Sequence, residues 1–323
     1  MDEFGLIQQY FKRQNIPNSK VILGVGDDAA ILKVSEGQSL VACVDTMVSG
    51  VHFHPDVSPS SLGYKLAMVN LSDIAAMGAT PVWATLCLTL PGIDEAWLES
   101  FSNGLFEALD KCNVQLVGGD TTKGPMTLSL QLGGEVVHDK ALARHGATVG
   151  DDVWVSGSLG GAAYALDLLA KSTSIDTLQS GSRLRLERPE ARVELGLALQ
   201  GLASACIDVS DGLLADAGHL CASSKVAVDF ELSALPLHPS LSELNSPDMA
   251  LPYALAGGDD YELLFTAGSA QCGKIAELSG PLGIELTKIG SVLNGGVIRC
   301  LYNGADVSAD HQHLRGFNHF SPH

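Results

Sequence analysis

The chain has 323 residues, a length that suggests two domains. Hydrophobic residues make up 46% of it and charged residues 17%, a balance typical of a packed globular protein and not of a disordered chain. The net charge of -18 makes a large basic surface improbable, so nucleic acid is not expected as a partner.

Seven cysteines, an odd number without a Cys-x-x-Cys pair, stand mostly in apolar runs. This pattern favours reduced, buried thiols in a cytosolic protein. The first residues, Met1-Asp-Glu, lack the basic start of a signal peptide, and no apolar run approaches the ~20 residues of a membrane span. We therefore expect a cytoplasmic protein without a membrane segment.

In the first half of the chain, apolar residues at helical spacing alternate with strand-like runs. A serine can cap the second helix, which stops at Gly78, and Asp94 can cap the third. Helices are predicted at 3–13, from Ser60 or Ser61 to Met77, and after Asp94; strands are predicted at 29–34, 40–44, 83–90, 114–117 and 126–137.

The second half begins after the loop 144–151 and repeats the mixture of strands and helices. Strands are predicted at 153–156, up to Asp208, and at 226–232, 263–266 and 284–292; helices are predicted after Gly161, after Pro189, after Gly212 and at 273–278. This order predicts an α/β or α+β protein with domains at 1–150 and 151–323.

Carboxylates stand where apolar residues are expected, and they are the candidate site. Asp45 ends an apolar strand, and Asp73 lies on the apolar face of a helix. A carboxylate in such a place costs free energy unless it is paired or holds a metal. The same habit recurs at Asp28, Asp120, Asp208 and Asp211.

Each of these residues also has a structural interpretation. Asp27 and Asp28 suit a turn, Asp120 and Asp208 suit turns or caps, and Asp73 suits a buried salt bridge with Lys65. His52 and His54 suit an ordinary loop, and Gly157–Gly161 suits a tight strand–helix turn as well as a phosphate contact. From the residues alone, these alternatives stay open.

The run Gly24-Val-Gly26-Asp-Asp28-Ala29 matches a dinucleotide fingerprint by letter. We reject that interpretation because a pyrophosphate would face two aspartates, and the following residues predict a strand, not a helix. Converging carboxylates repel one another and need cations, and hard oxygen ligands favour Mg²⁺. Together with an arginine and glycine-rich turns, they indicate a nucleotide phosphate site without a P-loop or protein-kinase motif.

Eight motifs, in one order along nearly the whole chain, resemble those of the thiamine-monophosphate kinase family. They are Gly24-Val-Gly-Asp-Asp28-Ala, Val44-Asp45-Thr46, Gly50-Val-His52-Phe, Asn70-Leu-Ser-Asp73-Ile-Ala-Ala-Met-Gly78-Ala, Gly118-Gly-Asp120-Thr-Thr, Ala141-Leu-Ala-Arg144-x-Gly-Ala, Ile207-Asp208-Val-Ser210-Asp211-Gly212 and Gly257-Gly-Asp-Asp-Tyr-Glu262-Leu. The run from Asn70 to Ala79 is the most specific of them.

The resemblance implies transfer of the γ-phosphate of ATP to thiamine monophosphate, giving thiamine diphosphate. It implies the two-domain fold of aminoimidazole-ribonucleotide synthetase, with an N-terminal domain that binds ATP and Mg²⁺ and forms a homodimer through its sheet, and a C-terminal α/β domain. By matching position it implies Mg²⁺ ligands, with Thr46 beside them, ATP contacts and thiamine-phosphate contacts. The Mg²⁺ ligands are Asp28, Asp45, Asp73, Asp120, Asp208 and Asp211 with the backbone of Cys43 and Val44; the ATP contacts are Gly119, Asp120, Arg144 and Ser210; the thiamine-phosphate contacts are His52, Asp259 and Phe320.

The resemblance also assigns the catalytic role to Asp45, Asp73, Asp120 and Asp211. The chain departs from relatives in three places: many have a glutamate where this chain has Asp259, many have a second proline after Pro189 where this chain reads Pro189-Glu-Ala-Arg192, and some have a tryptophan where this chain has Phe320. A phenylalanine still offers a π face to a thiazolium ring.

Three alternatives remain. A sister enzyme of the same fold could make selenophosphate or an aminoimidazole product, but the selenophosphate enzymes usually carry a reactive Cys near the N-terminus, and the first one here is Cys43 inside a predicted strand. A hydrogenase-maturation scaffold would end in a cysteine-bearing tail, whereas this chain ends Asn318-His-Phe-Ser-Pro-His323. The third alternative is a non-catalytic acidic metal-binding module.

Overall fold

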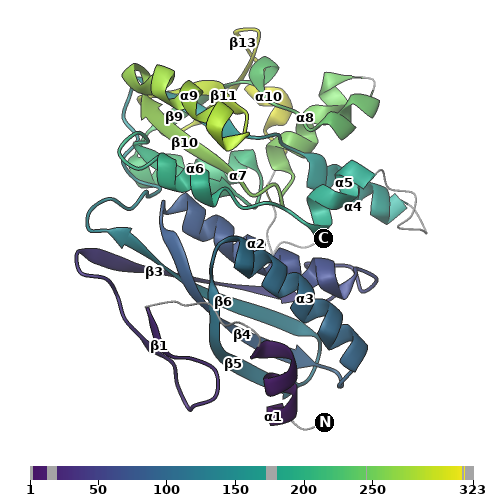
Figure 1. The fold of residues 1–323 in the computed structure, drawn as a ribbon. Coiled ribbons are helices and arrows are strands. Elements are labelled where there is room, and N and C mark those ends of the chain that lie inside the picture. The colour runs from purple at the N-terminus through teal and green to yellow at the C-terminus, as the bar shows by residue number, and fades with distance from the viewer. Residues whose placement is uncertain (1–2, 13–19, 172–179, 245, 315, 317–323) are drawn as a thin grey trace. The chain divides into compact units, whose positions relative to one another are not determined.

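The protein is described by a computed structural model that covers residues 3–12, 20–171, 180–244, 246–314 and 316 (Figure 1). The chain divides into two compact units, one comprising Met1–Ile74 and Ala79–Ala141, the other Ala75–Gly78 and Leu142–His323. Both combine helices with a sheet, so the predicted mixed α/β class is confirmed. The predicted domain ranges, 1–150 and 151–323, and the functions assigned to them stay predictions.

The first unit is built on a four-stranded sheet in the order β3-β6-β4-β5. Its strands are β3 (Gln38–Val48), β4 (Thr80–Leu90), β5 (Gln115–Lys123) and β6 (Thr127–Val137). The pairs β3–β6 and β6–β4 are antiparallel, and β4–β5 is parallel. Two long helices, α2 (Pro59–Ala76) and α3 (Glu95–Lys111), lie side by side along the sheet (Figure 1).

Alternation along the strands separates a covered face from an open one. On β4, Ala84, Leu86 and Leu88 are buried, while Cys87 between them is exposed. On β3, Val44 is 62% exposed, whereas Met47 is buried. The predicted strands at 40–44 and 83–90 are therefore confirmed, although both are longer than the sequence indicated.

The caps of the two long helices show how far local signals reach. Asp94 accepts a hydrogen bond from the backbone N–H of Trp97 at 3.1 Å, as predicted. The cap predicted for α2 was wrong: Ser58, not Ser60 or Ser61, accepts from the backbone N–H of Ser61 at 3.1 Å. A serine run offers several equivalent hydroxyls, and the chain direction at the helix entry selects one of them.

The N-terminal elements are short. They are α1 (Glu3–Leu6), the π-helical turn η1 (Ile7–Phe11), β1 (Val21–Leu23) and β2 (Ile31–Leu32). The helix predicted at 3–13 thus becomes an α-turn followed by a π-turn, and its last residue lies outside the described residues. The predicted strand at 29–34 contains only the two residues of β2, which pairs antiparallel with β1.

The second unit carries a seven-stranded sheet in the order β13-β12-β9-β11-β7-β10-β8. Its strands are β7 (Asp151–Ser156), β8 (Ala205–Val209), β9 (Ala227–Glu231), β10 (Glu262–Gly268), β11 (Leu286–Leu293), β12 (Ile298–Tyr302) and β13 (Ala305–Asp306). Only β12–β9 is a parallel pair. Its core includes Val155, Ile207, Phe230, Leu264 and Ile289, all buried.

Helices and short turns connect these strands. They are α4 (Gly161–Lys171), α5 (Ser180–Glu187), α6 (Val193–Ala198), α7 (Leu213–Ser224), η3 (Leu232–Ala234), η4 (Pro239–Glu243), α8 (Pro247–Ala256), η5 (Ser269–Gln271), α9 (Cys272–Leu282) and α10 (Ser308–His311). The helix predicted after Pro189 is present as α6, but it begins at Val193, so Pro189 does not lie in its first turn. The sequence analysis also missed α8.

All seven cysteines are free, as predicted, but they are not uniformly buried: Cys206, Cys221 and Cys300 are buried, and Cys87 is exposed. Among the described residues, no helix is both long enough and apolar enough to cross a bilayer.

Candidate functional site

In the first unit, predicted site residues meet where β3 faces α2. Cys43 and Asp45 alternate on β3 and are half-buried. On α2, Asn70 and Asp73 are three residues apart and so share one side of the helix. The side-chain oxygen of Asn70 accepts from the backbone N–H of Asp45 at 3.1 Å, and the thiol of Cys43 donates to the backbone oxygen of Asn70 at 3.4 Å.

Two carboxylates of this junction act on the Cys43 thiol. The pKa of the Cys43 thiol is raised well above its ordinary value, first by burial and then by the carboxylates of Asp73 and Asp45. Since a negative neighbour opposes a second negative charge, the shift places both carboxylates close to one thiol. The structure therefore brings Cys43, Asp45 and Asp73 together, and their role as Mg²⁺ ligands stays a prediction.

Gly119 and Asp120 occupy a different place. The strand predicted at 114–117 was too short, since β5 continues to Lys123 and Asp120 lies within it, opposite Cys87 of β4. Asp120 is exposed. A Cβ on Gly119 would lie 1.8 Å from the backbone oxygen of Leu86, so only glycine fits there. Because β6 and β4 separate β3 from β5, the backbones at Asp45 and Asp120 lie roughly 14 Å apart by strand spacing.

Three further predicted residues lie on turns or on the open face of this unit. Asp28 is exposed on the turn between β1 and β2, and its backbone N–H donates to the Asp27 carboxylate at 2.8 Å. His52 is half-buried, and its Nδ1 accepts from the backbone N–H of Val48 at 3.1 Å. This hydrogen bond leaves Nε2 to carry the proton of the neutral ring. The hydroxyl of Thr46 lies 2.7 Å from that of Ser129 on the neighbouring strand.

In the second unit, the end of β8 and the start of α7 carry a cluster of acids. Asp208 is buried in β8, and Ser210 and Asp211 follow it. The backbone N–H groups of Ser210 and Asp211 donate to the carboxylate of Asp216, at 3.0 and 3.1 Å. Burial, and next the Asp208 carboxylate, raise the pKa of Asp216 to about 7. The structure thus brings Asp208, Ser210 and Asp211 together.

Asp216 was missed by the sequence analysis. The available signal was an acid in the first turn of an otherwise apolar helix, where it can accept from the free backbone N–H groups at the helix start. Asp216 is buried and shapes the turn that presents Ser210 and Asp211.

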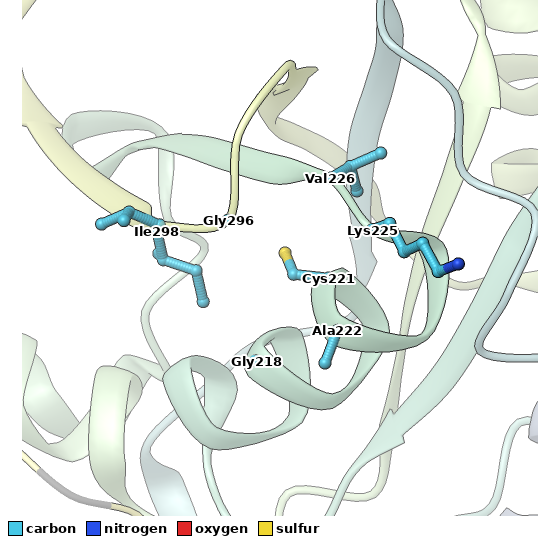
Figure 2. A pocket seen from close by; sticks show the side chains of 8 residues that line it. Gly218, Cys221, Ala222, Lys225, Val226, Gly296 and Ile298 are labelled. Carbon is cyan, nitrogen blue, oxygen red and sulfur yellow. The ribbon is translucent and has the colours of Figure 1, made fainter.

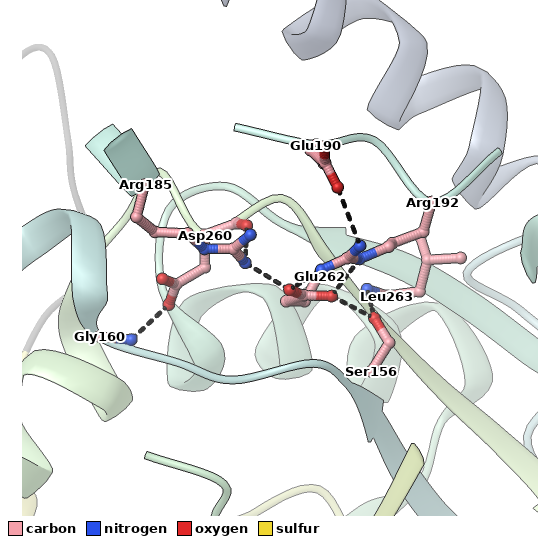
Figure 3. Close-up of polar contacts among 8 residues, drawn as sticks. All are labelled: Ser156, Gly160, Arg185, Glu190, Arg192, Asp260, Glu262 and Leu263. Carbon is pink, nitrogen blue, oxygen red and sulfur yellow. Dashed lines mark hydrogen bonds and ion pairs between the residues drawn. The ribbon is translucent and has the colours of Figure 1, made fainter. Parts of the chain in front are cut away.

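Asp259 joins this cluster through its backbone, because its N–H donates to the backbone oxygen of Ser210 at 2.9 Å. Three residues further along the chain, the fully buried carboxylate of Glu262 forms ion pairs with Arg185 and Arg192 (Figure 3). Glu262 belongs to the motif that begins at Gly257, but neither it nor the two arginines was predicted to have a role in the site. No local pattern identifies an arginine whose partner lies 70 or more residues away.

Arg144 lies away from Ser210 within the same unit. Its backbone oxygen accepts from the Ser224 hydroxyl at the end of α7, at 2.9 Å. The neighbouring Ala143 accepts from the backbone N–H of Cys206, near the start of β8. Cys206 and Ser210 are four residues apart, so roughly 13 Å of extended chain separates the two places. Phe320 lies outside the described residues.

The glycine-rich segment Gly157–Gly161 is a tight turn between β7 and α4. Its amides serve the protein itself: Gly157 donates to Glu285, Leu159 to Pro236 and Gly160 to the Asp260 carboxylate, each at 2.8 Å. The turn interpretation is therefore confirmed, and these three amides are not available for phosphate.

A cavity of about 370 Å³ in the second unit has a different character (Figure 2). It is lined by the C-terminal half of α7 and by the chain entering β12, including Cys221, Lys225, Val226 and Ile298. No carboxylate lines it, so it does not suit a magnesium–phosphate complex.

The donor set fits Mg²⁺ only in part. Within the described ranges, no three His, Cys, Asp or Glu side chains are gathered so that they could hold a metal by themselves. Mg²⁺ in phosphate-transfer sites is ordinarily held by one or two carboxylates together with substrate phosphates and water. The carboxylates of Asp45 and Asp73, and those of Asp208 and Asp211, have the hard oxygen chemistry that such a shared site requires.

Comparison with protein families finds two matches in chain order. A family described as AIR synthase related protein, N-terminal domain, matches residues 26–136, and its C-terminal domain counterpart matches residues 148–300. Together these matches span most of the chain and both of its units.

Individual relatives extend the match to nearly the full length. The chain is 42% identical to the thiamine-monophosphate kinase of Escherichia coli strain K12 over 99% of this chain and 98% of that one. A crystal structure of the thiamine-monophosphate kinase of Stenotrophomonas maltophilia superposes with a TM-score of 0.87 at 44% identity, covering 94% of this chain and 98% of that chain. A structure of AaThiL complexed with AMPPCP and TMP superposes with a TM-score of 0.76 at 30% identity, covering 98% and 97%.

Proposed function

Because the chain belongs to the thiamine-monophosphate kinase family within the AIR synthase related proteins, we propose that it transfers the γ-phosphate of ATP to thiamine monophosphate. The product is thiamine diphosphate. The observation that carries the proposal is the pair of acids, Asp45 and Asp73, that makes the surroundings of Cys43 negative in a chain matching this family over 99% of its length. A relative that binds AMPPCP, an ATP analogue, together with TMP supports the same pair of substrates.

Mg²⁺ is the proposed cofactor, and its carboxylate ligands are Asp28, Asp45, Asp73, Asp120, Asp208 and Asp211, with the backbone of Cys43 and Val44 beside them. A single ion requires oxygens ~2.1 Å away, whereas roughly 14 Å separates the backbones at Asp45 and Asp120. We therefore assign these two acids to different ions. This division supports the expectation of several ions, each completed by phosphate oxygens or water.

ATP is proposed to contact Gly119, Asp120, Arg144 and Ser210. Arg144 and Ser210 lie toward opposite ends of β8, so they would contact different parts of one extended nucleotide. The exposed guanidinium of Arg144 suits a phosphate or ribose oxygen because it offers several donors in one plane. Ser210 would bind closer to the acids Asp208 and Asp211.

Thiamine monophosphate is proposed to contact His52, Asp259 and Phe320. With Nδ1 accepting from Val48, His52 presents Nε2–H as a donor, which suits a phosphate oxygen. Asp259 is a carboxylate and therefore suits the cationic thiazolium or an amino group of the pyrimidine. The role proposed for Phe320 is stacking, and it rests on the sequence resemblance alone.

The proposed mechanism gives each of these residues a role. An acceptor phosphate oxygen is already ionised at neutral pH, so the transfer needs no strong general base. When bound, Mg²⁺ would supply neutralisation of the ATP and acceptor phosphates. Asp45 and Asp73 would hold that charge in place, Arg144 and Ser210 would orient the nucleotide, and His52 would orient the acceptor. Catalysis is then positioning plus charge stabilisation.

A homodimer formed through the sheet of the first unit is also proposed. Val44 and Leu40 of β3 are 62% and 52% exposed, and Cys87 of β4 is exposed as well. Large apolar side chains on an open sheet face favour a covering partner. Localisation in the cytoplasm stays a prediction from the sequence.

The test is ADP release by the purified protein with ATP and Mg²⁺, measured with and without thiamine monophosphate while thiamine diphosphate is followed by chromatography. The proposal predicts acceptor-dependent ADP release with an equal amount of thiamine diphosphate. ATP turnover that is indifferent to thiamine monophosphate would move the function to a sister enzyme of the same fold. A protein that binds Mg²⁺ but does not turn over ATP would be a non-catalytic metal-binding module.

A further inference from the structure

The loop between α8 and β10 has an unusual backbone. Asp259 and Tyr261 have φ angles of +67° and +51°, in the left-handed region that side-chain-bearing residues rarely adopt. Such residues persist only where the surrounding structure holds them, and they concentrate at functional sites. The loop also carries Asp259, the proposed contact to thiamine monophosphate.

One side of this loop is tied to the end of β8. The backbone N–H of Asp259 donates to Ser210 at 2.9 Å, and that of Tyr261 donates to Val209 at 2.8 Å. The Tyr261 hydroxyl also donates to the Asp259 carboxylate at 2.7 Å, which limits the rotamers of that side chain. These contacts set where the Asp259 carboxylate points.

The other side of the loop ends in a buried ionic cluster, which we define as Arg185, Arg192, Glu262 and Ser156 (Figure 3). Glu262 accepts from the Nε and Nη2 of Arg192, both at 2.6 Å, and from the Ser156 hydroxyl at 2.6 Å. Arg185 pairs with the same carboxylate and also donates to the backbone oxygen of Asp260 at 2.7 Å. Arg185 thus contacts both the loop, at Asp260, and Glu262, the first residue of β10.

Two glycines of the β7–α4 turn also help to hold the loop in place. The backbone N–H of Gly160 donates to the Asp260 carboxylate at 2.8 Å. A Cβ on Gly157 would lie 2.1 Å from Oε1 of Glu262, so the turn leaves room for this carboxylate only because residue 157 is glycine. The backbone of the loop is therefore fixed on both sides of the left-handed Asp259 and Tyr261.

We propose that Glu262, held by Arg185 and Arg192, is a positioning residue that fixes the strained loop and thereby places the Asp259 carboxylate for thiamine monophosphate. This inference rests on the proposed function of Asp259. A buried ion cluster contributes little to stability compared with well-packed apolar side chains, so its presence beside a strained loop indicates a positional role.

The binding of ATP should depend on this ionic cluster much less than the binding of thiamine monophosphate does. Ser210 and Asp211 have a second support, because their backbone N–H groups donate to Asp216 at 3.0 and 3.1 Å. Loosening Glu262 therefore frees Asp259 first and leaves Ser210 held. The expected signature is a change in the KM for thiamine monophosphate without a matching change in the KM for ATP.

The test compares Arg192→Lys, which keeps a charge but loses the two-point contact, with Glu262→Gln. The matched control is Asp229→Asn, which breaks the two-point contact between Arg299 and Asp229 on another strand pair of the same sheet. Hydrogen exchange of the peptide spanning residues 257–262 is measured by mass spectrometry in the full-length protein. The two KM values are measured in parallel.

We expect faster exchange of this peptide in Arg192→Lys and Glu262→Gln but not in Asp229→Asn. In Arg192→Lys the KM for thiamine monophosphate should rise about tenfold, and the KM for ATP should change much less. Arg192→Lys keeps the test valid if Glu262→Gln does not fold.

Unchanged exchange in Arg192→Lys would overturn the inference, and so would equal changes in the two KM values or faster exchange in Asp229→Asn as well. If the wild-type protein released ADP without needing thiamine monophosphate, the proposed function would fail instead. The exchange measurement would then still decide whether the cluster holds the loop.

Discussion

Around Cys43 in the first unit and around Glu262 in the second, ionisable side chains respond to their neighbours in opposite directions. Burial and the carboxylates of Asp73 and Asp45 raise the pKa of the Cys43 thiol. At Glu262 burial also favours the neutral form, but Arg185 and Arg192 outweigh it and hold the pKa below its ordinary value.

The difference shows how the neighbours of a half-buried or buried group decide the direction of its pKa shift. In the first region the neighbouring carboxylates reinforce the effect of burial on the thiol, whereas in the second region two arginines oppose the effect of burial on Glu262. We therefore interpret Asp45 and Asp73 as ligands and Glu262 as a support. The expectations below test that division, beginning with the largest effect.

Asp45→Asn or Asp73→Asn should lower turnover by about 10²–10³-fold, because each removes a charge that stabilises the transferring phosphate. Thiamine diphosphate formation at saturating Mg²⁺ measures this effect. Asp56→Asn, at an exposed acid of the same unit, is the control and should leave turnover unchanged. Near-wild-type turnover in either variant would remove that carboxylate from the essential set.

Glu262→Gln should destabilise the protein by about 3 kcal/mol at neutral pH, since it removes the buried carboxylate that pairs with both Arg185 and Arg192. The folded pKa of Glu262 lies below the ordinary value of 4.5, so its contribution is present above about pH 4.5 and is lost as the pH falls through the folded value. Urea unfolding of both proteins across this range measures the difference. A loss that does not shrink in acid would contradict the assigned charge state.

Mg²⁺ with a non-hydrolysable ATP analogue should stabilise the wild-type protein by about 2.7 kcal/mol when the complex is present at 100 times its Kd. Asp45→Asn should lose most of this stabilisation, because the variant lacks one of the carboxylates proposed to bind Mg²⁺. Thermal unfolding with and without EDTA measures it. Equal gains in both proteins would place the ion elsewhere.

Asp260→Asn should change stability least at acidic pH and should stabilise the protein as the pH rises. Burial raises the pKa of Asp260 from 3.8 to about 8, against the influence of Arg185 and with smaller contributions from Glu262 and Asp259. The folded state therefore binds a proton at Asp260 that the unfolded state releases, and the contribution of Asp260 to stability falls between about pH 4 and about pH 8. The urea concentration at the unfolding midpoint is measured for both proteins at several pH values, and the variant's value should exceed that of the wild type by more as the pH rises. A difference that does not change with pH would show that Asp260 is ionised in the fold.

Much of the fold was accessible to local reasoning. Alternation identified β4, strand-like runs identified β3 and β6, and one acidic residue identified the start of α3 at Asp94. The errors lie where several local solutions are equivalent. Ser58, Ser60 and Ser61 are all competent caps, and a Pro189 that suits a helix start can equally precede one.

The candidate site divides in the same way. Asp45 and Asp73 were each identified as acids in apolar contexts, and the structure brings both near one thiol. The position of Asp120 did not follow, because glycines concealed the continuation of β5. Asp216 was missed since an acid near a helix start resembles an ordinary surface residue.

By itself, the sequence determined the mixed α/β class, the order of the acidic motifs and the family, because these depend on residue type and spacing along the chain. Only the tertiary structure decided that the Glu262 carboxylate is paired with arginines of the same protein. Arg185 and Arg192 reach Glu262 across 77 and 70 residues, and such a contact depends on how β7, α5 and β10 pack. Charge compensation is a property of neighbours in space, and spacing along the chain does not record it.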